Sequence, residues 1–340
     1  MSQDARRHYE AIQRAVRAAD GVIDGAGEEV LAAWNRVATG SLPVTEAQRR
    51  QFMRDVDTIT ASTFGTPAAG VAASPLFKAI IAESERLFVA QYKVGLDELD
   101  TIMKPYGWWP AQRERLINGS MSAARRDHLS QAYKIVYGPH VDKQRLLNAK
   151  LFEPQRTWVD ARGHRLSNRI WKQGEAYRTA IDRTIQKGIR QGWSADRMAM
   201  ELRQYVKPGY APVKYTKSGR VYRVGNTYRP NAASAARRLA RTEITRVHGQ
   251  ATIERSRDVP GVKGMRWRLS LQHPKADNCD TNATSDSYEL GEGVYPLDNV
   301  PTYPDHPNCM CTLVPAHKSR EETRQDIYNK YAPYIFTGEW

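Results

Sequence analysis

The sequence is 340 residues long, which exceeds the usual size of one hydrophobic core, so we expect two domains or one domain with a long helical arm. A formal net charge of +14 predicts attraction to polyanions, chiefly nucleic acid or an anionic membrane. Three cysteines are too few for a secreted disulfide scaffold, and the sequence has neither a signal-peptide segment nor an apolar run of membrane length, so we expect folding in a cytoplasm and no membrane contact.

The first half of the chain carries apolar residues at helical spacing, with clear helix starts and stops. Thr45 and Gln48 form a capping-box pattern that predicts a helix start, and the segment 65–70, which contains two glycines, predicts its end. The side chains expected on the shared face of this helix are Phe52, Val56, Ile59 and Thr63.

A second helix start is predicted at Ser74 and Pro75, because serine caps a helix and proline fits its first position. The apolar stripe that follows begins at Phe77, reaches Leu99 and stops before Pro105. This pattern predicts a long amphipathic helix.

A further helix is expected to begin at Pro110 and to end where the pair Gly138 and Pro139 interrupts it. We therefore expect a helical region over residues 1–140, which would dock on a larger assembly. A linker over residues 141–163 would follow it.

The second half opens with a basic amphipathic helix from Arg165, for which Gly192 fits the C-terminal cap. Ser194 is expected to cap a short helix that ends near Tyr205. Residues 207–230 are rich in Tyr, Val and Lys around a Ser-Gly turn, which predicts a β-hairpin inserted into a helical body.

A long helix is expected from Ala232 to Ser256. Its inward residues would be Ala236, Ala240, Ile244, Val247 and Ala251. Its outward residues would be Arg237, Arg238, Arg241, Arg246, Arg255 and Arg257, the last just beyond the helix.

Beyond Pro260 the pattern changes to strands and loops. Met265–Leu271 alternates as a strand, and Thr312–Val314 predicts another. The predicted fold class is α+β and predominantly α: a long helical N-terminal region precedes a module of helix and small β-sheet with Cys/His loops over residues 164–316, and residues 317–340 form a C-terminal tail.

The most distinctive chemistry-bearing group contains Cys279, His306, Cys309 and Cys311. In an extended segment, residues two apart face the same side, so the last two thiols can converge, and a turn at Pro307 can fold the histidine back toward them. Four such ligands would close a tetrahedral zinc site with a structural role, because no position would remain for water. The alternatives are free buried thiols and a disulfide.

Ala240 to Ile244 contains the second motif, Arg241-Thr242-Glu243, within the long helix. An arginine and a glutamate two apart do not face each other on a helix, so Glu243 is expected to form a structural pair with another partner such as Arg246. We expect no enzyme activity from it, because no matched acid, base or nucleophile stands nearby in the sequence.

Two basic helices could present cations to a phosphate backbone without reading base sequence, as non-specific DNA-binding proteins do. The alternative is an ordinary solvated face, but the net charge exceeds what solubility requires. The residues expected to contact DNA are Arg169, Lys172, Arg183, Lys187, Arg237, Arg238 and Arg241.

The order of these pieces over residues 164–315 resembles the Mu F-like head-morphogenesis family of phage minor head proteins. The features that carry the resemblance are the basic helix, Gly192-Trp193-Ser194, Ala240-Arg241-Thr242-Glu243, the strand around Trp267, Cys279, and His306-Pro307-Asn308-Cys309-Met310-Cys311 running into Thr312-Leu313-Val314-Pro315.

The resemblance implies a minor capsid protein of the virion that binds the portal protein and double-stranded DNA, with the major capsid protein or a scaffolding protein as further candidate partners. It implies roles in head assembly and in DNA packaging or ejection. The protein would lie in the host cytoplasm during assembly and then in the head interior or at the portal.

The sequence departs from the family pattern at one position. Family members tend to carry a Cys-x-x-Cys pair where this chain has Cys279 and Asn282. Either His306 then completes a metal site, or Asp277 or Asp280 does so through oxygen, or the loops hold without zinc.

Two other functions stay open from the sequence. A metal-assisted nuclease or another phage-borne effector would use a histidine and a basic DNA-binding face, but it needs carboxylates around an open metal position. A non-specific nucleoid-type DNA-binding protein would bind DNA tightly without a protein partner.

Overall fold

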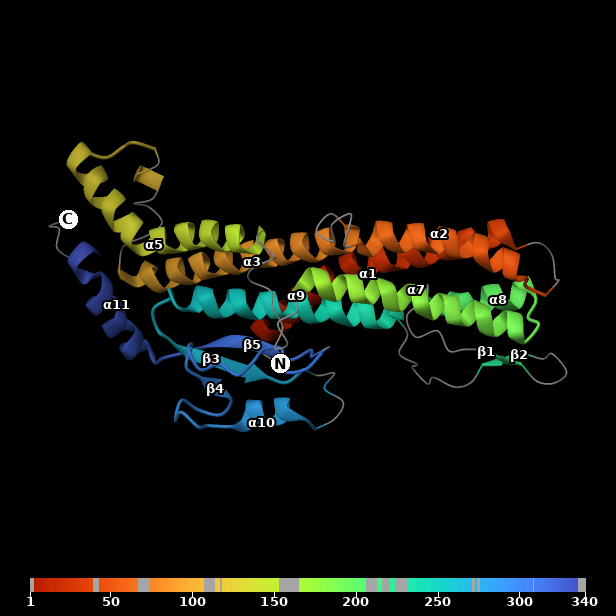
Figure 1. Cartoon of the computed structure of the whole chain (residues 1–340). Helices are drawn as coiled ribbons and strands as arrows, with labels where there is room; N and C mark the ends of the chain where they lie inside the picture. The colour runs from red at the N-terminus through yellow and green to blue at the C-terminus, as the bar shows by residue number, and fades with distance from the viewer. Residues whose placement is uncertain are drawn as a thin grey trace. The chain divides into compact units, whose positions relative to one another are not determined.

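The computed structural model describes residues 3–38, 43–66, 74–106, 114–116, 118–152, 165–205, 213–215, 221–223, 232–270, 273, 276–307 and 309–335. The chain is mostly helical and carries a small antiparallel sheet and a Cys/His group in its C-terminal region, so the predicted class, α+β and predominantly α, is confirmed (Figure 1). No helix in these ranges has the length and apolar character needed to cross a bilayer.

The structure divides into two compact units that are not consecutive along the chain. Unit 1 contains residues 1–13, 84–152 and 244–340, and unit 2 contains residues 14–83 and 153–243. This differs from the expected division at residues 140 and 164, because three long helices each contribute residues to both units.

The described residues of unit 2 form mainly helices, together with a hairpin. It contains most of α1 (Gln3–Val37), α2 (Glu46–Phe64), the start of α3 (Pro75–Met103), α7 (Leu166–Arg190), α8 (Ala195–Leu202), the 3-10 turn η3 (Arg203–Tyr205) and the start of α9 (Ala232–Ser256). The strands β1 (Val213–Tyr215) and β2 (Val221–Arg223) pair antiparallel, which confirms a hairpin in the predicted segment.

Helices α2 and α7 pack closely in unit 2 because a glycine lies at their contact. A Cβ on Gly174 would come within 2.7 Å of the Cβ of Phe64. The ring of Phe64 also packs on Tyr177, with ring centroids 5.5 Å apart. The predicted capping box is present, with Thr45 Oγ1 accepting from the Gln48 amide at 3.2 Å.

Unit 1 combines helices with the sheet. It contains the rest of α3, the 3-10 turn η2 (Lys104–Tyr106), α5 (Ala123–Phe152), the rest of α9, α10 (Asn278–Thr284) and α11 (Arg320–Ile335), which packs on α5. The sheet has the order β4–β3–β5 and is antiparallel, with β3 at Val262–Arg268, β4 at Val294–Tyr295 and β5 at Thr312–His317.

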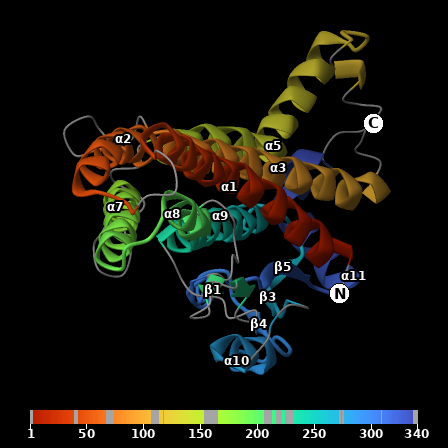
Figure 2. The same ribbon diagram turned by 90° about the vertical axis from the view of Figure 1, so that its right-hand side faces the viewer.

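The sheet and α10 form the scaffold of the candidate site. Helix α10 contacts β3, and Figure 2 shows it beside the strands. Among the described residues β5 is an edge strand of the sheet. An edge strand tolerates Pro315, because proline has no backbone N–H to donate to a further strand. The buried cluster around the sheet contains Met265, Trp267, Cys279, Tyr295, Tyr303, Cys309, Cys311 and Leu313.

Two predictions about helix boundaries need correction. Helix α5 begins at Ala123 and continues through Gly138 and Pro139 to Phe152, so the predicted break is wrong. A proline inside a helix removes one backbone hydrogen bond but does not have to end the helix. The predicted linker over residues 141–163 is therefore helical as far as Phe152, and its remainder lies outside the described residues.

The single helix predicted from Pro110 is interrupted, since residues 118–122 are not helical, and Pro110 itself lies outside the described residues. Several other boundaries are confirmed. Helix α9 covers Ala232–Ser256 as predicted, and its five inward residues are all buried. The Ser74 hydroxyl caps α3 by accepting from the Phe77 amide at 3.3 Å. Ser194 caps α8 in the same way. The strand predicted at Met265–Leu271 begins earlier, at Val262, and ends at Arg268.

Candidate metal centre

Local structure at α10 places the first cysteine of the candidate site. Asp277 is the N-cap of α10, and its carboxylate accepts from the backbone amide of Cys279 at 2.7 Å. Asp280 completes a capping box by accepting from the amide of Asp277 at 2.7 Å. The cap fixes the helix start, so the side chain of Cys279 is held against the sheet, where it is fully buried.

The other residues come from the segment that leads into β5. The amide of Cys309 donates to the carbonyl of His306 at 3.2 Å, so the chain turns and brings the imidazole back toward the thiols. Cys309 and Cys311 follow this turn and are each 1 % exposed. The predicted convergence of His306 is therefore present with Cys279 and Cys309.

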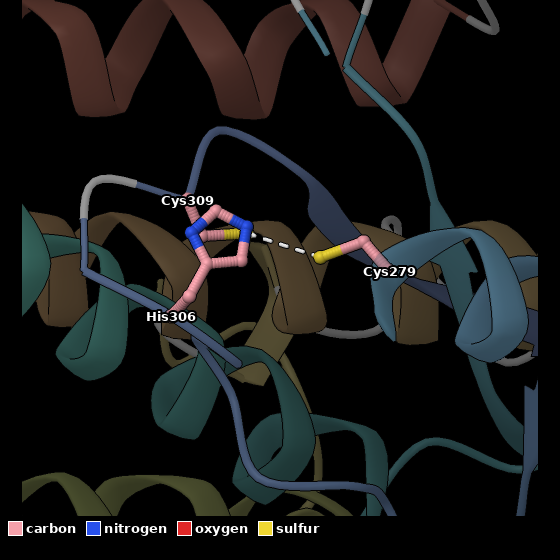
Figure 3. Close-up of side chains that lie close together, drawn as sticks. All are labelled: Cys279, His306 and Cys309. Carbon is pink, nitrogen blue, oxygen red and sulfur yellow. Dashed lines mark hydrogen bonds between the residues drawn. The ribbon is translucent and has the colours of Figure 1, made fainter. Parts of the chain in front are cut away.

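The side chains meet at distances that suit a metal ion. The Sγ atoms of Cys279 and Cys309 are 3.6 Å apart, and one ligand atom from each of Cys279, His306 and Cys309 lies within 4.8 Å of the others (Figure 3). Two thiolates on one tetrahedral zinc lie roughly 3.8 Å apart. All three cysteines of the chain are free thiols, so the structure contains no disulfide.

The fourth predicted ligand, Cys311, is buried beside this group but is not one of its three members. Hydrogen bonding with Cys309 lowers the pKa of Cys311 to about 6. Burial raises the pKa of Cys279, and the hydrogen bond with Cys311 raises that of Cys309. The Cys311 thiol therefore loses its proton more readily than the other two thiols, and a bound cation would favour the thiolate form of each ligand.

A second group of oxygen and nitrogen ligands borders the first. Ligand atoms of His273, Asp277 and Asp280 also lie within 4.8 Å of one another. His273 Nε2 is 2.9 Å from Asp280 Oδ2, and this hydrogen bond raises the pKa of His273. His306 Nε2 lies 3.2 Å from Asp277 Oδ2, although the two atoms are not aligned for a hydrogen bond.

The thiol group lies in a closed environment. The Tyr303 hydroxyl donates to the carbonyl of Cys311 at 2.7 Å, and the Tyr303 ring packs edge-on against Trp267 with centroids 5.4 Å apart. Tyr295 donates through its hydroxyl to the carbonyl of Asn282 at 2.9 Å. Asn282 is thus held to the sheet through its backbone.

No family model, no curated protein and no solved structure matches this chain. The donor set itself therefore decides what the site can do: two thiols and an imidazole favour a borderline-soft ion such as zinc. Because Cys279 and Cys309 are buried, an ion held there would join α10 to the loop before β5.

The Arg-Thr-Glu motif has a structural role in unit 2. Glu243 is fully buried, and its carboxylate accepts from Arg169 of α7 at 2.5 Å. The expected structural pairing of Glu243 is present, with Arg169 as its partner. Arg169 lies on α7 and Glu243 on α9, so the ion pair joins these two helices.

The residues predicted to contact DNA fall into two groups. Arg237 is buried and pairs with Asp24, and the side chain of Arg169 is only 13 % exposed. The predicted DNA contacts of these two residues are therefore not supported, because neither side chain is well exposed. The outward placement predicted for Arg255 is also wrong, because it is 1 % exposed. An arginine on a helix that is covered by its neighbours must find a carboxylate partner.

The exposed residues of the predicted DNA-contact set are Lys172, Arg183, Lys187 and Arg238, whereas Arg241 is partly buried. Lys187 also lies over the ring of Trp193, with its Nζ 5.6 Å from the ring centroid. The predicted basic face is therefore smaller than the sequence indicated.

Proposed function

We propose that this chain is a phage minor head protein that binds the portal protein and packaged DNA, and that acts in head assembly and in DNA packaging or ejection. The observation that carries the proposal is the meeting of Cys279, His306 and Cys309, the residues on which the resemblance to the Mu F-like family most depends. A buried group of this kind stabilises a module and suits a structural component of an assembly better than a catalyst.

We further propose that the ion is zinc. Cys279, Cys309 and His306 would supply three ligands, and Cys311 or Asp277 would supply the fourth, since both lie beside the group. With four protein ligands the ion has no position left for a substrate, so its role is to hold α10 against the loop that leads into β5.

The partner test is native mass spectrometry of the chain co-expressed with the portal protein encoded beside it, at low and moderate salt. We expect a complex of defined stoichiometry, and a mass that includes one zinc per chain. Association that fails at both salt concentrations, while each protein is folded, would rule out the portal role. That result would also rule out the proposed location at the portal or in the head interior.

DNA contact is tested by fluorescence anisotropy with duplexes of unrelated sequence. The variant Lys172→Gln/Arg183→Gln/Lys187→Gln should bind each duplex more weakly and lower the salt slope by about one per lost phosphate contact. The matched control is Arg50→Gln/Lys78→Gln/Lys93→Gln, which removes the same charge from exposed positions on α2 and α3. Equal losses in both variants would show that the α7 residues form no binding face.

A second candidate function is a metal-assisted nuclease, which the neighbouring group of His273, Asp277 and Asp280 favours, because it offers carboxylates that are partly exposed. An open site of this kind could hold a divalent ion with exchangeable water. Magnesium-dependent plasmid cleavage that disappears in His306→Ala and in His273→Ala would support this function. Absence of cleavage with magnesium and with manganese would remove it.

A further inference from the structure

Three buried polar side chains meet inside unit 1, and none of them belongs to the candidate metal centre. They are His8 of α1, Gln91 of α3 and His248 of α9, with exposed fractions of 7 %, 6 % and 2 %. His8 Nδ1 lies 3.2 Å from His248 Nε2, and Gln91 Nε2 lies 2.8 Å from the same nitrogen. The two imidazole rings meet edge-on, with centroids 4.8 Å apart.

The chemistry of this contact requires a neutral His248. With the Gln91 amide nitrogen as donor, His248 Nε2 must accept through its single lone pair and therefore carries no proton, while His8 Nδ1 lies 3.2 Å from the same nitrogen. A proton on His248 Nε2 would place two N–H donors, from His248 and from Gln91, against each other. The carbonyl oxygen of Gln91, which is buried and has no hydrogen-bond partner among the described residues, could accept that proton only if the amide rotated.

Neighbouring groups also disfavour a positive charge on His248. Arg255 lies one heptad further along α9 and is held by Glu98 of α3, with Arg255 Nη1 3.3 Å from the carboxylate. Burial, His8 and Arg255 all lower the pKa of His248. Tyr303 packs against Gly249, the residue that follows His248, and it is neutral because burial raises the pKa of its hydroxyl well above the usual value.

His8 lies in the first segment of α1, and unit 1 contains this helix only as far as Gln13. A second polar contact holds the same segment, since Gln13 Nε2 donates to the sulfur of Met310 at 3.6 Å. A thioether is a weak acceptor, so the imidazole contact is the stronger of the two.

We propose that His8, Gln91 and His248 form an acid-sensitive latch: near neutral pH it holds the first residues of α1 against α3 and α9, and acidification releases them. A histidine that is buried in its neutral form binds fewer protons when the segment is docked than when it is free. The docked state therefore loses stability as the pH falls below about 6.5, the ordinary value for a free imidazole. Each linked proton weakens docking by up to about tenfold per pH unit.

The test is hydrogen–deuterium exchange of the full chain between pH 7.5 and 5.0, with each rate corrected for the intrinsic pH dependence of exchange. For residues 6–13 we expect protection to fall by about fivefold for each linked proton from pH 6.5 to 5.5. The peptide from α2, Glu46–Phe64, contains no histidine and serves as the internal control. Unchanged protection of residues 6–13 down to pH 5.0 would overturn the latch.

Two variants separate the latch from general acid unfolding. His8→Gln/His248→Gln cannot take up these protons and should lose the pH dependence at residues 6–13. Gln91→Glu places a carboxylate beside His248 and should keep the segment docked to lower pH, because a neighbouring negative charge favours the imidazolium. If the double variant keeps the wild-type dependence, or if Gln91→Glu releases the segment at higher pH than wild type, the latch is wrong.

Discussion

Replacing Gly249 by alanine tests whether the α9 helix supports the candidate metal centre. A Cβ at this position would overlap the Cδ1 and Cε1 atoms of the Tyr303 ring. That ring cannot shift freely, because its hydroxyl donates to the carbonyl of Cys311 and the ring packs edge-on against Trp267. An alanine would therefore push Tyr303 and, through it, the cysteine loop.

The size of the effect follows from three contributions to the free energy of unfolding. Overpacking a filled core costs about 1–3 kcal/mol. Weakening the hydrogen bond from Tyr303 to Cys311 costs about 1 kcal/mol. Alanine favours the helix over glycine by about 1 kcal/mol, which offsets part of the loss. We expect Gly249→Ala to lower the free energy of unfolding by about 1–3 kcal/mol, and displaced ligands to lower metal affinity by about 10- to 100-fold.

Urea unfolding monitored by tryptophan fluorescence gives the first quantity, and competition with a zinc chelator gives the second. The matched control is Gly21→Ala in α1, where a Cβ meets no atom within 4 Å, so it should stabilise the chain by up to about 1 kcal/mol. If Gly249→Ala gains as much stability as Gly21→Ala and holds zinc equally well, Tyr303 is not fixed against α9 and the argument fails.

Three further predictions concern the metal and two local contacts. Zinc content measured by native mass spectrometry should fall from one per chain to none in Cys279→Ser, and a chelator should lower the thermal midpoint of wild type but not of this variant. Glu243→Gln should cost about 3–5 kcal/mol in urea unfolding, because it leaves the cation of Arg169 poorly solvated, whereas Glu46→Gln at an exposed pair should cost less than about 1 kcal/mol. Thr45→Ala should cost about 1 kcal/mol in the same assay through loss of the helix cap.

Helix ends were predictable where neighbouring residues determine them. The capping pairs at Thr45 and Ser74 depend on hydrogen bonds within three residues, and both are present. Pro139 misled the prediction, because whether a helix tolerates a proline depends on the packing of the whole helix and not on the Gly-Pro pair alone. Local rules thus located helix starts better than helix interruptions.

The candidate site was predictable in part. His306 and Cys309 lie in one short segment, so a turn between them sufficed to predict their approach. Cys279 was assigned by ligand chemistry alone, and its position beside them is confirmed. The sequence offered Asp277 only as an alternative oxygen ligand for a metal. Its role as the cap of α10 was not predicted, and its position beside His306 depends on the packing of two distant segments.

The buried polar residues of unit 1 were missed. His8 and His248 are separated by 240 positions, and no local pattern joins them. A signal did exist on α9, where the polar residues Thr245, His248, Thr252 and Arg255 follow the spacing of one helical face and are all buried. The apolar residues of the same helix predicted a single buried face, whereas α9 is buried on more than one side.

The buried arginines change which residues can attract DNA, but they leave the electrostatic argument intact. Arg169, Arg237 and Arg255 pair with Glu243, Asp24 and Glu98 respectively, so each buried cation is matched by at least one carboxylate. Each of these ion pairs contains one positive and one negative charge, so leaving all three out of the charge sum does not change the net charge of +14. The excess therefore belongs to the remaining groups. Non-specific attraction to a polyanion depends on that excess, and it would persist if every buried arginine were replaced together with its partner.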